Sequence, residues 1–513
     1  MGTCIPTARA RRTPLAVCLS AALAFASTSS APAATPAAHL LHRRADGLTP
    51  LFEQIGRRAD AVQATRHGTR RPEGGIIIPV ASCADDGGTD TLRHAVLVAS
   101  SGDTVDLSGL ACSTITLAAG AIGVDIDDLA IVGPGATHLT IDAGHASRVF
   151  RHGGAGTLSV EDLTVANGSY TQPTGPYGGG CIYSAGTLSM SGAVVTGCTA
   201  SGDGTIAGGA VFALDSIFMF GSAVTDSQLT SINGYMSVGA IGGGAFAGQE
   251  IVFEHSIISG NSVDAPLGDV YGGGLGALSV IAKYSTVHGN TVTATPGGVY
   301  YSVGGGMIAT QSVLVEYSTF DGNTADGGGA ILIRGTGYTV TFRNTTVSGN
   351  HANVIAGAML VEADITIENS TVAFNTGGTA GGGGIILQGT TTELESTIVA
   401  DNSPSAMMAA ADLDGTATVT GANNLVKISG ITLPPDTITT DPQLGPLAAN
   451  GGETRTHALP ATSVAIDAGN NVAGAFADQR GPGFARTVGA FPDIGAYELD
   501  TDVIFDDGFD AGG

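Results

Sequence analysis

ITIENSTVAFN, residues 365–375, is the clearest copy of the repeat that decides the fold. Side chains alternate between the two faces of a strand, so Ile365 and Ile367 share one face, and Val372 begins a second inward position after a bend near Asn369. Short β-branched runs between glycine clusters are typical of strands, whereas a helix needs apolar residues about 3.6 positions apart. The stretch therefore predicts two short strands joined by a corner.

Nine copies of this pattern lie between Leu158 and Asn402, at spacings that vary from 25 to 34 residues. The strands are constant while the loops differ in length, which is typical of a solenoid whose coils contact only their neighbours. We expect the asparagines that recur at the sixth position to occupy a corner at positive φ and to bond to the amide of the next coil. The sixth residues are Gly168, Cys198, Ser227, Asn261, Asn290, Asn323, Asn350, Asn375 and Asp401.

Two other positions of the repeat predict vertical ladders. An inward apolar position should stack from coil to coil about 4.8 Å apart, and its residues are Val165, Val195, Val224, Ile258, Val287, Phe320, Val347, Val372 and Ile398. An outward position, two residues before each Ser or Thr anchor, alternates in sign. Opposite charges on neighbouring strands stabilise a sheet, and the residues at this position are Glu254, Lys283, Glu316, Arg343 and Glu368.

The repeat resembles the right-handed parallel β-helix repeats of secreted bacterial proteins. The resemblance implies an all-β, right-handed parallel β-helix over residues 158–402. Residues 80–157 should form the N-terminal cap and first coils, because residues 89–100 predict a short amphipathic helix with a polar N-terminal cap. This region resembles the N-terminal region of exported proteins that carry a CSLREA motif, which is reduced here to TLRHA from Thr91.

The parts outside the repeat predict export. Residues 1–33 have three arginines, an apolar run and a small-residue cleavage site, as a signal peptide does. Residues 34–79 are basic and polar, which indicates a linker or pro-segment. The acidic tail, residues 501–513, resembles terminal sorting motifs of exported proteins of Gram-negative bacteria. We expect a secreted protein, or one on the outer surface of such a bacterium, without a transmembrane helix.

The C-terminal part, residues 403–500, loses the repeat. DPQLGPLAANGG from Asp441, TRTHALPATSVAIDAGN from Thr454 and DIGAYE from Asp493 resemble the C-terminal region of the choice-of-anchor Q family, for which no enzymatic activity is known. Charged residues in this part predict an ion-paired cap over the last coil, with a Ca²⁺ site or a cell-wall ligand as alternatives. These residues are Arg455, Arg480, Arg486, Asp467, Asp478, Asp493 and Glu498.

Four cysteines remain after removal of the signal peptide, and an even number in an exported chain favours disulfides. A Cys83–Cys112 bond would clamp the N-terminal cap and a Cys181–Cys198 bond would join neighbouring coils, although four cysteines allow three pairings. No CxxC zinc site occurs.

The charge balance excludes one class of ligand. The formal net charge is −25, and after residue 80 only 10 basic residues face 41 acidic ones. Phosphate binding needs clustered cations, so nucleic acid is not expected as a partner. Acidic chains favour divalent cations, but no EF-hand loop or RTX nonapeptide is present. We expect no cofactor, with Ca²⁺ left as the one open metal, and a monomer.

The long steps of the repeat bring loops 199–207, 228–241, 262–271 and 291–303 onto adjacent coils, where they should form one wall. Aromatic rings stack on the apolar faces of sugars and carboxylates bond to hydroxyls, so the wall is a candidate glycan-binding surface. Packing of the tyrosines on one another is the alternative. The candidate residues are Tyr177, Tyr235, Tyr271, Tyr300, Tyr301, Asp203, Asp264 and Asp269.

The sequence favours an adhesin-like, envelope- or glycan-interacting rod without catalytic activity, although a passive structural spacer would share the same sequence signals. The rival hypothesis is a polysaccharide lyase or glycoside hydrolase. A lyase needs cations to neutralise a uronate, and the four loops contain no Lys, Arg or His. A glycosidase needs two carboxylates about 5–9.5 Å apart, which Asp203, Asp264 and Asp269 would have to supply.

Overall fold

The computed structural model describes residues 75–172, 177–232, 238–266, 268–294, 302–378, 380–404 and 412–500. The chain divides into two units, residues 1–34 and 35–513, and every described residue belongs to the second. The predicted signal peptide and the acidic tail therefore lie outside the described residues, as does the linker up to residue 74. No helix among the described residues is long and apolar enough to cross a membrane.

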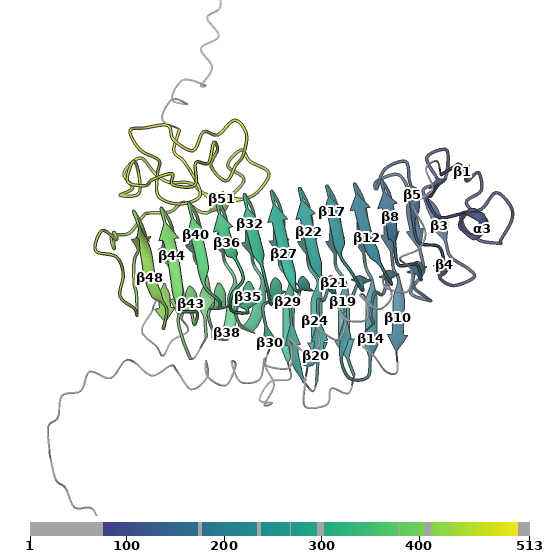
Figure 1. Cartoon of the computed structure of the whole chain (residues 1–513), viewed down its shortest axis with the longest axis horizontal. Coiled ribbons are helices and arrows are strands. Elements are labelled where there is room, and N and C mark those ends of the chain that lie inside the picture. The colour runs from purple at the N-terminus through teal and green to yellow at the C-terminus, as the bar shows by residue number, and fades with distance from the viewer. Residues whose placement is uncertain are drawn as a thin grey trace, which may run out of the picture. The chain divides into compact units, whose positions relative to one another are not determined.

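The described residues form a parallel β-helix in which each coil adds one strand to each of three long sheets (Figure 1). Sheet I consists of β1 (Ile77–Pro79), β2 (Asp103–Asp106), β5 (Leu129–Val132), β8 (Thr157–Glu161), β12 (Thr187–Ser191), β17 (Ile217–Phe220), β22 (Glu250–Glu254), β27 (Ser279–Lys283), β32 (Val313–Glu316), β36 (Val340–Arg343), β40 (Ile365–Glu368), β44 (Thr391–Glu395) and β48 (Thr418–Ala422). Sheet II consists of β3 (Thr114–Thr116), β6 (Thr140–Asp142), β9 (Thr164–Ala166), β13 (Val194–Thr196), β18 (Ala223–Thr225), β23 (Ile257–Ser259), β28 (Thr286–His288), β33 (Thr319–Asp321), β37 (Thr346–Ser348), β41 (Thr371–Ala373), β45 (Ile398–Ala400) and β49 (Leu425–Val426). Sheet III consists of β4 (Ile122–Val124), β7 (Phe150–His152), β11 (Ile182–Ser184), β16 (Val211–Ala213), β21 (Ala245–Ala247), β26 (Leu275–Ala277), β31 (Met307–Ala309), β35 (Ile331–Arg334), β39 (Met359–Glu362), β43 (Ile385–Leu387) and β47 (Leu413–Gly415).

A fourth sheet leaves the coils between sheets II and III, and we call it the wing. Its outgoing strands are β10 (Ser169–Gln172), β14 (Thr199–Gly202), β19 (Gln228–Ser231), β24 (Ser262–Ala265), β29 (Thr291–Ala294), β34 (Thr324–Gly327), β38 (His351–Ile355), β42 (Thr376–Gly377) and β46 (Ser403–Pro404). Its return strands are β15 (Ile206–Ala207), β20 (Val238–Ile241), β25 (Asp269–Tyr271) and β30 (Ser302–Val303). A short antiparallel pair, β50 (Leu447–Ala448) and β51 (Thr456–His457), lies in the C-terminal part.

The predicted apolar column stacks in register through sheet II. Val287 pairs with Phe320, which pairs with Val347, and all three belong to the main buried core. The prediction is one residue out of register in the ninth coil, where Val372 pairs with Val399 instead of Ile398. The reason is that Thr397 is the anchor of this coil, since its amide donates to Asn424 Oδ1 while the Ser396 hydroxyl bonds to Asn470. Ile398 points to the opposite face.

The asparagines form a buried amide ladder along the coils. Asn290 donates from both its backbone N and its Nδ2 to Asn323 Oδ1, at 3.0 Å each, and Asn323 makes the same two bonds to Asn350. The predicted amide–amide bonding is confirmed, but the predicted positive φ is wrong. The left-handed residue is the one before the asparagine, for example Gly322 at φ 64°, so the asparagine turns inward.

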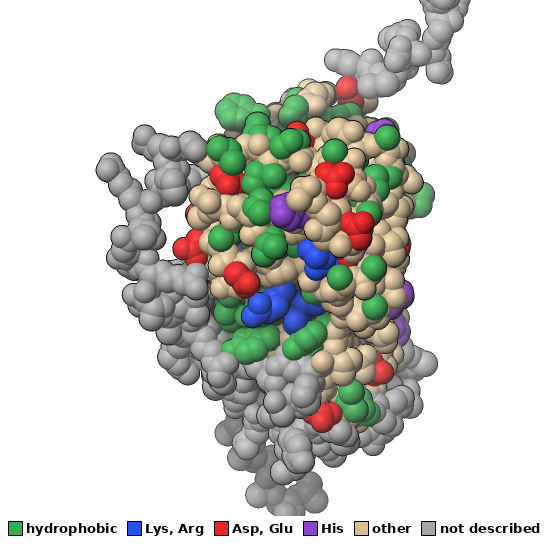
Figure 2. All heavy atoms as spheres, turned by 90° about the vertical axis from the view of Figure 1, so that its right-hand side faces the viewer, with side chains coloured by type: hydrophobic (Ala, Val, Ile, Leu, Met, Phe, Trp, Pro, Cys, Tyr) green, Lys and Arg blue, Asp and Glu red, His purple; other side chains and the backbone are tan. Residues whose placement is uncertain are grey.

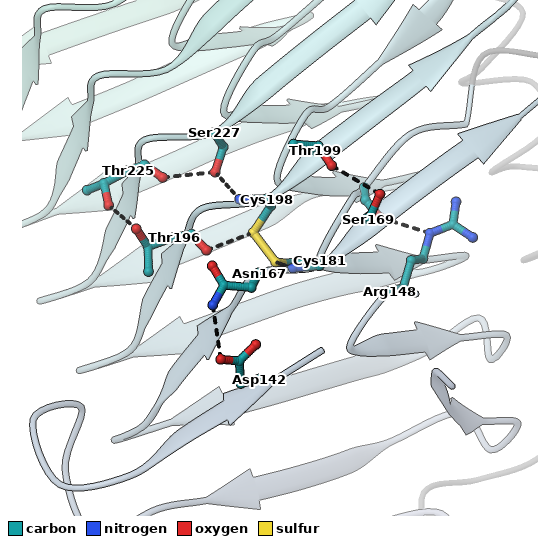
Figure 3. Close-up of a disulfide and its surroundings, with 12 residues drawn as sticks. Asp142, Arg148, Asn167, Ser169, Cys181, Thr196, Cys198, Thr199, Thr225 and Ser227 are labelled. Atoms are coloured by element: carbon teal, nitrogen blue, oxygen red, sulfur yellow. Dashed lines mark hydrogen bonds between the residues drawn. A yellow bond between two sulfur atoms is a disulfide. The ribbon is translucent and has the colours of Figure 1, made fainter. Parts of the chain in front are cut away.

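The asparagine ladder ends in a carboxylate at its C-terminal end and in a serine and a disulfide-bonded cysteine at its N-terminal end. At the C-terminal side Asn402 donates to Asp412 Oδ1, and burial raises the pKa of that carboxyl. At the N-terminal side the column continues through Ser227 to Cys198, whose amide donates to Ser227 Oγ. Cys198 is bonded to Cys181, and Figure 3 shows this disulfide between Ser227 and Asn167. Cys83 and Cys112 form the second disulfide, so both expected pairings are confirmed.

The predicted charge ladder runs along the C-terminal ends of the sheet I strands. Glu254, Lys283, Glu316, Arg343 and Glu368 occupy paired positions on successive strands. Glu316 lies 3.2 Å from Lys283 Nζ and 3.1 Å from Arg343 Nη1, and Arg343 Nε lies 2.6 Å from Glu368. The alternation fails at Glu395, the next residue in the column, where the amide of Asn470 donates to the carboxylate instead.

The N-terminal end is covered as predicted by a helix, α3 (Leu92–Val98), capped by the Thr91 side chain. Leu92, Ala95 and Val96 pack on the main core. Arg93 forms a two-pronged pair with Asp85. Burial by itself would raise the pKa of the Asp85 carboxyl, but the bond to Arg93 and two backbone amides together outweigh it and lower the pKa. Figure 2 faces this end and shows hydrophobic side chains among polar ones on its surface. The linker boundary was predicted too late, because β1 begins at Ile77 and pairs with β2.

Residues 428–438 close the last coil, because Ile431 and Leu433 pack on the main core and Ile438 bonds to Asn424 and Val426. The region of residues 441–500, here called the C-terminal region, was predicted to cap this coil. It lies instead against the outer face of sheet II, over several coils. Gln479 shows the docking best: its Oε1 accepts from the Thr346 hydroxyl at 2.6 Å, and its Nε2 donates to Ser318 O and Thr319 Oγ1.

Two of the predicted arginines make ion pairs within the C-terminal region. Arg480 pairs with Asp478 and Arg486 pairs with Glu498, both buried, whereas Arg455 reaches across to Asp321 of β33. Burial raises the pKa of Glu498 to about 7, although the nearby Arg486 and the amides of Val488 and Asp493 act in the opposite direction.

The raised pKa of Glu498 predicts a pH-dependent stability. A carboxyl whose pKa is higher in the folded state than its value of 4.5 in the open chain stabilises the fold below pH 4.5, and this contribution is lost as the pH rises through about 7. We expect Glu498 to contribute a fall in unfolding free energy of about 3 kcal/mol across this window. Hydrogen exchange of the C-terminal region at pH 4.5 and 7.5 should show the fall, and Glu498→Gln should flatten it. An equal slope in both proteins would contradict the assignment.

Candidate functional site

The four long loops that the sequence singled out form the two-layered part of the wing. Each loop leaves the coil as one strand and returns as another, and each strand pairs in parallel with its counterpart on the next coil. The outgoing and return layers join at β34, where Thr324 pairs with Thr291 and Gly327 pairs with Val303. The structure thus brings loops 199–207, 228–241, 262–271 and 291–303 together on one side of the β-helix.

Two separate apolar clusters fix the orientation of the wing. One lies between its two layers, where Leu229, Val263 and Val292 of the outgoing strands belong to the same buried cluster as Ile206 and Val270 of the return strands. The other lies between the return strands and the outer face of sheet III, and it contains Ile241, Tyr271, Phe246, Ile308 and Leu332. Side chains alternate along a strand, so the outer face of the outgoing strands is the one left to solvent.

This outer face carries two rows of polar side chains, most of them Ser or Thr, at right angles to the strands. The first row consists of Ser169, Thr199, Gln228, Ser262, Thr291, Thr324 and His351. The second row consists of Thr171, Ser201, Thr230, Asp264 and Thr293. Each of these side chains is half-buried or exposed, and the two rows of described residues contain neither Lys nor Arg.

The rows are ordered by their own hydrogen bonds. The Thr171 and Ser201 hydroxyls lie 3.0 Å apart, and the Thr199 hydroxyl donates to Ser169 Oγ at 3.1 Å. In-register strands repeat about every 4.8 Å, so donors and acceptors recur at a fixed spacing along the helix axis. Such a surface can bond to a ligand whose hydroxyls also repeat.

The predicted wall residues do not share this face. Asp203 and Asp264 are exposed, and Asp264 belongs to the second row. Tyr177 is half-buried and packs edge-on against Tyr183 and Phe212. Tyr235, Tyr300 and Tyr301 lie outside the described residues.

Tyr271 does not belong to the predicted glycan-binding wall. It lies on a return strand, its side chain faces sheet III, and it is only 1% exposed, so its ring cannot stack on a sugar. Burial raises the pKa of its hydroxyl well above the ordinary value, and the neighbouring Asp269 adds to the shift. Asp269 is buried on the same strand, and the charges of the buried Arg334–Glu362 pair also act on the Tyr271 hydroxyl.

The burial of Asp269 also bears on catalysis. Asp264 faces solvent from an outgoing strand, whereas Asp269 is buried on a return strand, on the same strand face as Tyr271. Two carboxylates that flank one glycosidic bond must reach the same substrate. Asp264 and Asp269 therefore cannot act as the two catalytic carboxylates of one glycosidase site. Among the described residues, no group of three His, Cys, Asp or Glu side chains is placed to hold a metal ion.

The predicted glycan-binding wall did not include the two polar rows, because it was based on aromatic and acidic residues. The sequence nevertheless carries a signal for the rows. Directly after the sixth position of a coil, polar and apolar residues alternate in TASG from Thr199, QLTS from Gln228, SVDA from Ser262 and TVTA from Thr291. Alternation of this kind predicts a strand with one apolar and one polar face. The polar residues of these four segments belong to the two rows.

Comparison with known proteins gives one structural likeness. No family model and no curated protein sequence match the chain. The resemblances to the CSLREA and choice-of-anchor Q regions thus stay predictions. The crystal structure of pectate lyase Pel9A aligns with 84% of this chain and 98% of its own, at 13% identity and a TM-score of 0.37. The parallel β-helix itself is established by the strand pairing described above.

Proposed function

We propose that the protein is an exported, adhesin-like β-helix that binds a linear glycan along the outer face of the wing and does not cleave it. The observation that carries the proposal is the pair of hydroxyl-rich rows, which present regularly spaced donors and acceptors over successive coils. Two disulfides agree with an oxidising compartment outside the cytoplasm. A glycan offers matching hydroxyls without requiring cationic side chains.

A passive spacer and an enzyme are the competing functions. A spacer needs no regular spacing of polar groups on one face, and its outer surface would bind no sugar. A lyase acting on uronate polymers would produce unsaturated fragments that absorb ultraviolet light. Release of such fragments by the purified protein would replace a binding role with a catalytic one.

Replacement of two row hydroxyls tests the binding face. Thr230→Val with Thr293→Val keeps the shape of the side chains and removes two hydroxyls on either side of Asp264. Each hydrogen bond contributes about 0.5–1.5 kcal/mol, so we expect the affinity for a bound glycan to fall roughly tenfold or more. The measurement is a glycan array followed by titration of the strongest hit.

Thr366→Val is the matched control, because Thr366 is a half-buried, outward-facing threonine on sheet I, away from the wing. We expect it to bind as the unchanged protein does. A wild-type protein that binds no glycan on the array, or a double variant that binds as tightly as the control, would contradict the proposal.

A further inference from the structure

Sheet I carries an exposed apolar patch in the middle of its outer face. One outward position is paired from strand to strand through β12, β17, β22, β27, β32 and β36, and it is occupied by Ser189, Phe218, Val252, Ile281, Leu314 and Thr341. Four successive residues are thus large and apolar, with a polar residue at each end. Phe220, two residues further along β17, extends this patch.

The patch is accessible and has a polar rim. Phe218 is 40% exposed and Phe220 is 56% exposed, while Val252, Ile281 and Leu314 are half-buried among their neighbours. Towards the strand starts the rim consists of Glu250, Ser279 and Ser312, and towards the strand ends it is the charge ladder that begins at Glu254. Contiguous apolar surface with a polar rim is the usual composition of a protein–protein interface.

We infer that this face binds a second copy of the chain, with the two sheets I packed face to face around a two-fold axis parallel to the strands. The position of the charge ladder at one edge of the patch favours an axis parallel to the strands. A two-fold axis in this direction keeps the strand ends together, so the ladder of one copy lies opposite the ladder of the other. A two-fold axis along the β-helix would instead set Glu254 opposite Glu250, which repel, and would set Lys283 and Glu316 opposite the uncharged Ser279 and Ser312.

The position of the axis follows from the charges and the apolar residues taken together, because an axis between β27 and β32 would also pair opposite charges but would leave Phe218 and Val252 outside the apolar contact. With the axis between β22 and β27, Glu254 faces Lys283 of the second copy, and the converse pair forms by symmetry. The same position sets Phe218 against Leu314 and Val252 against Ile281, so all four apolar residues are covered. An axis that passes through β27 would set Lys283 against itself and Glu254 against Glu316, which repel. Closed two-fold pairs are the commonest assemblies of identical chains.

Sedimentation equilibrium of the full chain tests the inference, and it is independent of glycan binding. We expect a dimer that Phe218→Ser or Leu314→Ser dissociates roughly tenfold or more readily, since central apolar anchors dominate such interfaces. Phe476→Ser is the matched control, because Phe476 is the most exposed phenylalanine of the C-terminal region. It should leave the association unchanged.

A charge reversal tests the axis itself. Glu254→Lys should weaken the dimer because two lysines would then face each other, and Glu254→Lys combined with Lys283→Glu should restore it. Thermal unfolding of each variant shows whether the coils remain intact. A monomer at all concentrations, an unaffected dimer in Phe218→Ser, or no recovery in the folded double variant would each overturn the inference.

Discussion

Asn323→Ala should destabilise the middle of the β-helix by about 3–5 kcal/mol, because it leaves several buried polar groups without partners. Asn323 Oδ1 accepts two bonds from Asn290, and Asn323 Nδ2 donates to Val287 O and to Asn350 Oδ1. The residue is fully buried. Alanine removes all of these side-chain bonds and cannot fill the space.

Hydrogen exchange is the suitable measurement, since the coils of a solenoid open locally and a single unfolding free energy is poorly defined. The amide of Asn290 should exchange about two to three powers of ten faster in the variant, as each factor of ten corresponds to about 1.4 kcal/mol. Asn353→Ala is the control, because Asn353 is an exposed asparagine on the adjoining coil. Similar exchange in the two variants would show that the ladder is not what holds the coils together.

Arg486→Met should release the C-terminal region from sheet II. Arg486 and Glu498 are each 1% exposed, and the guanidinium also donates to the backbone carbonyls of Asp493 and Gly495. Removal of one member of a buried pair leaves the other charge uncompensated, at a cost of about 3–5 kcal/mol. The guanidinium lowers the pKa of Glu498, so the loss should be larger at pH 8, where the carboxyl is ionised, than at pH 5.

Limited proteolysis reports this release, since an undocked segment is cleaved before the coils are. We expect early cleavage within residues 441–500 of Arg486→Met, faster at pH 8. Arg151→Met serves as control, because Arg151 and its partner Asp125 are both largely exposed, and such pairs contribute at most about 1 kcal/mol. A cleavage pattern shared by the two variants would mean that the buried pair does not secure the docking.

The coil core was predictable from the sequence because its signal is redundant. Val287, Phe320 and Val347 stack as expected, and Lys283, Glu316 and Arg343 pair as expected, since each position recurs in many coils. The ninth coil was misaligned because Ser396 and Thr397 offer two adjacent hydroxyls, and the spacing alone does not say which is the anchor. The neighbouring C-terminal region decides it, since it bonds to Ser396.

Features that depend on contacts between distant segments were not predictable in the same way. Tyr271 was placed on the outside because nothing in the loop 262–271 says that its return strand faces sheet III. The C-terminal region was placed over the last coil, although Gln479 docks it on β33 and β37 by bonds to residues more than 130 positions away. The C-terminal region has no repeat, so its sequence contains no periodic pattern that would predict the surface on which it docks.

The amide ladder has a direction, and this direction governs how the protein can change in length. Each asparagine donates to the asparagine of the following coil and accepts from the one of the preceding coil, until the Asp412 carboxylate accepts from Asn402 and has no side-chain amide with which to donate further. A duplicated coil inserted between Asn290 and Asn350 would find an acceptor on one side and a donor on the other. A coil appended beyond Asp412 would find no side-chain amide to donate to it, so we expect this architecture to lengthen by duplication of interior coils while the Asp412 end is retained.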